Sequence, residues 1–107
     1  MEIILANSFL KRLIGFSFKK KVDYILLFRN CKGVHTFFMK FNVDLIMTDQ
    51  NNHFLYCFKE ISKNKIIYKK DAFFIYEIPS FFNYKIEDII NRGTQIHNQE
   101  SELNHRL

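Results

Sequence analysis

Residues 31–49, CKGVHTFFMKFNVDLIMTD, place a few polar groups within a long apolar stretch. From Val34 to Thr48 the odd-numbered positions are apolar except for His35, and most polar side chains fall on even-numbered positions. This period of two predicts a β-strand with one buried face. The polar residues 49–52 then predict a turn capped by the Asp49 carboxylate, and the apolar residues 53–61 predict the second strand of a β-hairpin.

Shorter elements surround this hairpin. Apolar and β-branched runs predict strands over residues 2–6, 24–29 and 71–79, with a lysine-rich loop or edge over 62–70. A short helix is predicted to start at Asn7 or Ser8, to run to about residue 14 and to end at Gly15. A second, amphipathic helix is predicted from residue 86, with Gly93 just beyond its end. The polar residues 97–107 predict a flexible tail after a single domain over residues 1–96.

Composition favours one compact domain. The chain has 107 residues, 48% of them hydrophobic, with one proline and three glycines, which is enough apolar surface for one core and no room for a second. No stretch is long and apolar enough for a membrane span, and the first residues lack the basic start of a signal peptide. Two cysteines are too few for a secreted disulfide scaffold, so a cytoplasmic location is expected. The expected fold class is α+β, with a curved, mostly antiparallel sheet or partial barrel and two short helices.

The residues of the hairpin region also resemble a known family. The pattern C-x-x-V-H-T-F-x-M-K-F-x-V-D over residues 31–44 is similar to the central motif of the bacterial and archaeal proteins grouped as domain of unknown function 192. Segments 6–19, 26–28, 45–49, 75–79 and 89–96 resemble further motifs of that family, in the same order. The chain departs from the family pattern at Phe16, Ser17, Lys19, Asn42 and Thr94.

This resemblance implies a compact, β-rich α+β domain and no established activity. Genes of the family often lie near secretion or pilus genes, which implies a partner related to the cell envelope or to secretion. An uncharacterised domain that binds a small molecule or a protein partner is therefore expected, with a non-enzymatic role favoured.

The expected binding patch combines polar groups with apolar residues of the same motif. Carboxylates beside apolar strand residues must find partners or change their pKa values, which occurs at binding sites and also in purely structural ion pairs. A structural role for these groups is the simpler alternative. The patch consists of His35, Phe37, Met39, Lys40, Asp44 and Glu77.

The sequence also contains residues suited to three other chemistries. A hydrolase would use Asp44 and Glu77 about 5 to 9.5 Å apart across an open cleft. A zinc site could use Cys31, His35, His53 and Cys57, but residues four apart in a strand lie about 13 Å apart, so no metal and no cofactor is expected. The lysines at 19–21 and at 63, 65, 69 and 70 could attract nucleic acid, but lysine also protects sheet edges, so nucleic acid is not the favoured partner.

Overall fold

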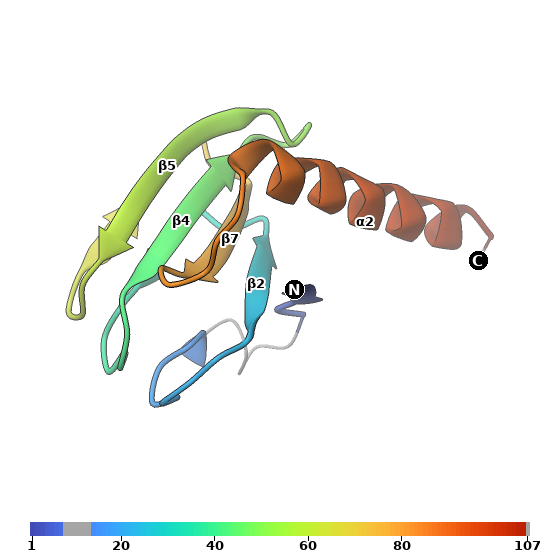
Figure 1. Cartoon of the computed structure of the whole chain (residues 1–107). Helices are drawn as coiled ribbons and strands as arrows, with labels where there is room; N and C mark the ends of the chain where they lie inside the picture. The colour runs from blue at the N-terminus through green and yellow to red at the C-terminus, as the bar shows by residue number, and fades with distance from the viewer. Residues whose placement is uncertain (8–13, 107) are drawn as a thin grey trace.

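The computed structural model describes residues 1–7 and 14–106 of the chain, and side chains as far as residue 100. Five strands form one sheet in the order β1-β2-β7-β4-β5, with β1 parallel to β2 and the other pairs antiparallel. Two short strands, β3 and β6, form a second sheet, and one long helix, α2, follows β7 (Figure 1). The elements are β1 Glu2–Leu5, β2 Tyr24–Arg29, β3 Gly33–His35, β4 Val43–Thr48, β5 Phe54–Ile61, β6 Ile66–Tyr68, β7 Phe74–Pro79 and α2 Ile86–Arg106.

This architecture confirms the expected α+β class, with an open sheet rather than a barrel. Within the described residues β1 and β5 are the two edges of the sheet. All six residues of β4 and all six of β7 are buried, because both faces of the sheet are covered. One apolar cluster, which includes Phe28, Leu45 and Ile75, lies on the first face, and a second, which includes Ile46, Tyr76 and Ile89 of α2, lies on the other.

The single strand predicted over residues 34–48 is wrong. The chain leaves β3 after His35 and enters β4 only at Val43. Thr36 causes the turn: its fully buried hydroxyl donates to the Ser62 carbonyl at 2.7 Å and accepts from the Lys65 amide at 2.8 Å. Residues 62–65 therefore hold the chain at Thr36, and the next three residues of the predicted lysine-rich segment form the strand β6, which pairs with β3.

The hairpin formed by β4 and β5 confirms the predicted turn. Oδ1 of Asp49 accepts hydrogen bonds from the backbone amides of Asn51 and His53, both at 2.9 Å. Asn52 adopts a φ of 62°, in the left-handed region that asparagine tolerates better than most residues. The carboxylate thus caps the turn as its position in the sequence indicates.

The predicted end of the second helix is wrong, because α2 continues through Gly93 to Arg106. Gly93 is instead the point at which the helix packs against β7. A Cβ atom at this position would lie 1.8 Å from the hydroxyl oxygen of Tyr76. Residues 97–106 are consequently part of a helix whose last turns extend beyond the strands (Figure 1). Most of the other predicted helix, residues 8–13, lies outside the described residues, although Gly15 does adopt a left-handed φ of 55°.

A buried polar network joins the hairpin turn to α2. Oδ1 of Asn52 accepts hydrogen bonds from the hydroxyls of Thr48 at 2.8 Å and Tyr76 at 2.9 Å. Nδ2 of Asn52 donates to the Ile90 carbonyl and to the Thr94 hydroxyl, both at 2.9 Å. One amide side chain therefore satisfies groups on the sheet and on the helix.

Replacing Asn52 should separate the two roles of this residue. Asn52→Ala should lower the free energy of unfolding by about 2 kcal/mol, because it leaves buried hydroxyls without a partner. Asn52→Gly removes the same hydrogen bonds, but glycine adopts the left-handed φ without steric strain, so it should be the milder change. Urea denaturation measures both. Asn51→Ala, at the exposed neighbouring position, should change stability by less than about 0.5 kcal/mol, and equal losses at positions 51 and 52 would contradict the proposed network.

Candidate functional site

Glu77 is a carboxylic acid in the centre of the sheet. It lies on β7 between β2 and β4, with Leu26 and Leu45 as its cross-strand partners. Its exposed fraction is 1%, so solvent barely reaches it. Both cross-strand partners are apolar, so neither supplies a counter-charge. A charged group is rarely buried in this way unless it is paired, hydrogen-bonded or protonated.

The Glu77 side chain lines a cavity of about 90 Å³ on the first face of the sheet. One water needs roughly 10–15 Å³ on this scale, so the cavity has room for several waters or for a small organic group. Two of the three glycines of the chain line it, and a Cβ atom on Gly15 would lie 3.2 Å from Oε1 of Glu77. The missing side chain at Gly15 keeps the space beside Glu77 open, whereas a Cβ atom on Gly33 would meet the β6 backbone at Ile67. The lining residues are Ile14, Gly15, Phe28, Gly33, Val34, His35 and Glu77.

The electrostatics of the cavity are unusual for a carboxyl group. The backbone amide of Phe16 donates a hydrogen bond to Glu77, but among the described residues Oε1 has no hydrogen-bond partner. Burial raises the pKa of Glu77 to about 8, and the Phe16 amide offsets only part of this effect. At neutral pH the free protein therefore holds Glu77 mainly in its protonated form.

His35 is the second polar residue of the cavity. It lies at the end of β3, where Nδ1 accepts a hydrogen bond from the Phe37 amide at 3.2 Å. Its ring stacks on the Phe37 ring with centroids 5.1 Å apart. In the neutral imidazole this arrangement places the proton on Nε2.

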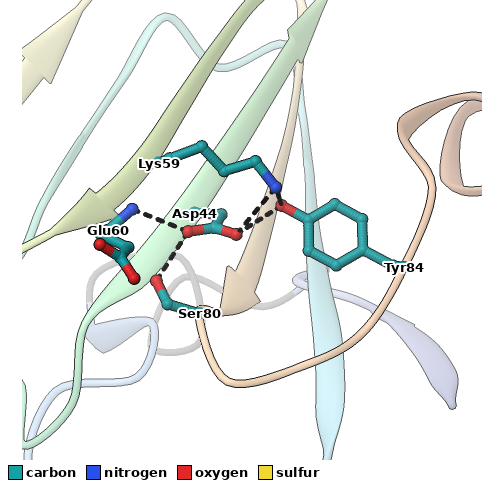
Figure 2. Close-up of polar contacts among 5 residues, drawn as sticks. All are labelled: Asp44, Lys59, Glu60, Ser80 and Tyr84. Carbon is teal, nitrogen blue, oxygen red and sulfur yellow. Dashed lines mark hydrogen bonds and ion pairs between the residues drawn. The ribbon is translucent and has the colours of Figure 1, made fainter.

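Asp44 lies on the opposite face of the sheet and stabilises a β-bulge. Val43 pairs with Ile61 and Leu45 pairs with Phe58, so two residues of β5 oppose Asp44. Its Oδ1 accepts the bulged Glu60 amide at 2.8 Å and the Ser80 hydroxyl at 2.6 Å (Figure 2). Asp44 thus joins β5 to the segment that follows β7.

The other oxygen of Asp44 holds the connection to α2. The Tyr84 hydroxyl donates to Oδ2 at 2.5 Å, and Nζ of Lys59 lies 3.5 Å from the same atom (Figure 2). Partial burial acts to raise the pKa of Asp44, but the hydrogen bonds and the Lys59 charge outweigh it and lower this pKa below its ordinary value. Burial and Asp44 together raise the pKa of Tyr84. A carboxylate with all these partners has a clear structural role.

The six residues of the expected patch do not share one surface. The structure brings together His35 and Glu77 at the cavity. Asp44 lies on the other face of the sheet, beside its cross-strand partner Ile78, which belongs to the second apolar cluster. The two carboxylates therefore do not face one another across a cleft, which removes the geometric basis of the hydrolase alternative. Met39 is part of the core, and Lys40 and the partly exposed Phe37 lie on the loop after β3.

The expected patch did not include five residues that line the cavity: Ile14, Gly15, Phe28, Gly33 and Val34. The glycines carried the available signal, since a glycine in or beside a strand often marks a close approach or an open space. Only the three-dimensional structure shows that two glycines distant in the sequence line the same cavity as Glu77.

The cysteines do not meet. Cys31 packs beside the first apolar cluster and Cys57 beside the second, on opposite faces of the sheet, and both thiols are free. Among the described side chains, those of residues 1–7 and 14–100, no group of three or more histidine, cysteine or acidic residues is placed to hold a metal ion. Desolvation raises the pKa of the Cys57 thiol.

Comparison with protein-family profiles and with curated protein sequences finds no match. Two solved structures share the fold. A protein of unknown function from Novosphingobium aromaticivorans superposes with a TM-score of 0.64 at 10% identity, over 74% of this chain and 63% of that one. A candidate transcription regulator from Sinorhizobium meliloti gives a TM-score of 0.64 at 13% identity, over 73% and 67%. This chain therefore spans less than two thirds of the Novosphingobium protein, and identities this low show a common fold alone.

Hydropathy adds one finding: the helix that the structure describes is not apolar enough to cross a membrane.

Proposed function

We propose that this protein is a non-enzymatic binding domain that holds a small primary amine in the Glu77 cavity. The observation that carries the proposal is the buried Oε1 of Glu77, which has no hydrogen-bond partner among the described residues and lies beside an open space of about 90 Å³. The similarity of residues 31–44 to the motif of domain of unknown function 192 supports a distant membership of that family, whose members have no established activity. The two free thiols suit a cytoplasmic location.

A protonated amine is the ligand class that the cavity suits best. Ionised Glu77 would be a buried charge without a counter-ion among the described residues, so a cation from outside would supply the missing partner. An ammonium group can donate to Oε1, while Phe28 and Val34 offer apolar contacts to a short carbon chain. The volume limits the ligand to a few heavy atoms in the cavity, or to the amine end of a longer molecule.

The pH dependence of binding tests this proposal. Ethylammonium should bind with an affinity that rises about tenfold per pH unit between pH 6 and 8, because Glu77 must release its proton first, and that is constant above pH 8. Isothermal titration calorimetry with ethylammonium chloride measures this slope, with potassium chloride as the ionic-strength control. Glu77→Gln should abolish binding, whereas Glu60→Gln, at an exposed glutamate, should leave it unchanged.

Two results would contradict the proposal. Binding of acetamide below pH 8 that disappears above pH 8 would contradict it. This result would mean that protonated Glu77 donates a hydrogen bond to a neutral ligand and that the cavity does not bind a cation. An absence of heat and of thermal stabilisation with ethylammonium at pH 9, where Glu77 is ionised, would mean that the cavity holds only water.

A further inference from the structure

Two exposed phenylalanines form a stacked pair on the surface. Phe18 is 63% exposed and Phe38 is 61% exposed, which is unusual for side chains of this size. Their ring centroids lie 4.8 Å apart with an interplanar angle of 14°. The rings therefore form a flat apolar platform that the described part of the chain leaves open to solvent. We call Phe18 and Phe38 the aromatic pair.

The backbone holds the aromatic pair in an unfavourable conformation. Phe18 has a φ of 68° and Phe38 a φ of 63°, and bulky residues rarely adopt the left-handed region. Two hydrogen bonds fix the turns: the Phe18 amide donates to the Phe38 carbonyl at 2.9 Å, and Oγ of Ser17 donates to the Phe37 carbonyl at 2.8 Å. Glycine or asparagine would suit both positions better, so stability alone does not account for phenylalanine there. Strain of this kind is concentrated at functional sites.

The segments around the aromatic pair are strongly basic. Residues 16–21, FSFKKK, contain Phe18, residues 36–42, TFFMKFN, contain Phe38, and residues 62–65, SKNK, contact the second segment through Thr36. All the lysines in these segments are exposed, and none of the three segments contains an acidic residue. The lysines are Lys19, Lys20, Lys21, Lys40, Lys63 and Lys65.

A groove of about 620 Å³ begins at Phe38. Lys40 and Lys63 supply positive charge to it, and Asn42, Ser62 and Asn64 supply neutral hydrogen-bonding groups. Its volume is in the range of sites for nucleotide-sized ligands. The groove thus offers phosphate and sugar contacts directly beside a ring on which a base can stack.

We propose that this surface binds single-stranded nucleic acid, with bases on the aromatic pair and phosphates on the surrounding lysines. Proteins that bind single strands without sequence preference combine a basic groove with stacking aromatic side chains. The lysines alone are equally suited to protecting sheet edges, and it is their position around an exposed, flat pair of rings that favours this ligand. An anionic membrane also attracts lysine and phenylalanine. The hydrogen-bonding groups of the groove at Asn42, Ser62 and Asn64 favour the sugars and phosphates of a nucleic acid instead.

Fluorescence anisotropy with a labelled 12-nucleotide single strand tests the proposal at low and moderate salt. The protein should bind this strand and should bind an abasic strand of equal length at least about tenfold more weakly, because base stacking contributes much of the affinity. Lys40→Gln with Lys63→Gln should reduce the slope of log affinity against log salt by about 1.4, since each lost phosphate contact contributes about 0.7. The charge-matched double variant Lys70→Gln with Lys85→Gln should keep the slope.

Replacing the aromatic pair distinguishes a binding role from a structural one. Phe18→Asn with Phe38→Asn should weaken binding at least tenfold while the melting temperature stays constant or rises, because asparagine relieves the left-handed strain. Phe54→Asn, at a 49% exposed phenylalanine at the other end of β4 and β5, should not affect binding. Equal affinity for the abasic strand, a lowered melting temperature with unchanged binding, or binding to phosphatidylserine vesicles without binding to the oligonucleotide would each overturn the proposal.

Discussion

Glu77→Gln should remove a loss of stability that the natural protein shows between pH 5 and pH 8. The unfolded chain releases the Glu77 proton near the ordinary pKa of 4.5, whereas the folded chain retains it up to about pH 8. Between these values unfolding releases a proton, so the free energy of unfolding falls by about 1.4 kcal/mol for each pH unit. Relative to Glu77→Gln, the natural protein should therefore lose on the order of 4 kcal/mol from pH 5 to pH 8 and little beyond that.

Urea denaturation of both proteins at one-unit intervals from pH 5 to pH 9 measures this difference, and other titrating groups cancel in it. Asp44→Asn is a suitable control because the folded pKa of Asp44 is lowered. Its contribution is complete above the ordinary pKa of an aspartate and is lost only as the pH falls through the folded value, so its pH dependence lies in acid. Parallel stability curves for the natural protein and Glu77→Gln would show that Glu77 is ionised in the folded state.

Gly93→Ala should lower the free energy of unfolding by about 3 kcal/mol, although alanine is a better helix former than glycine. The new Cβ atom would lie 1.8 Å from the Tyr76 hydroxyl and 2.7 Å from the ring carbon that carries it. Tyr76 is fully buried and bonded to Asn52, so it can yield only by breaking that bond or by moving α2. The expected loss therefore combines overpacking with a broken buried hydrogen bond.

Urea denaturation of Gly93→Ala compared with Gln95→Ala, at an exposed position of the same helix, measures the effect. Gln95→Ala should be neutral within about 0.5 kcal/mol. Gly93→Ala in a Tyr76→Phe background should cost less than in the natural protein, because the closest contact is removed. A stability gain for Gly93→Ala would mean that α2 does not pack on Tyr76 at Gly93.

Gly93 also shows where sequence reasoning reaches its limit. A glycine in a helical pattern can end the helix, or it can allow another element to pack closely against the helix. The local sequence around Gly93 is compatible with both structures. The neighbour, Tyr76, is on a strand that the local pattern does not connect to residue 93. The strands β2, β4 and β7 were predictable because their short apolar runs are the composition that a buried strand requires.

The prediction of one strand over residues 34–48 was wrong for a related reason. The alternation of residues 34–48 continues through the turn, so periodicity alone favours one strand. The hydrogen bonds of Thr36 to Ser62 and Lys65 end β3, and neither partner is near in the sequence. Similarly, Glu77 could be identified as a carboxylate in an apolar run, but its separation from Asp44 depended on the register between β4 and β7.

The position of β7 in the sheet has a consequence for how the chain folds. β7 is the last strand in the sequence, yet it is central in the sheet and alone joins β2 to β4. The β4–β5 hairpin can form early, and β1 can pair with β2, but these two units stay separate until residues 74–79 are available. Until then β2 and β4 each present an unpaired apolar edge, the kind of surface that recruits other chains. During synthesis the chain therefore passes through a period of exposure to aggregation that ends only when its last strand enters the gap.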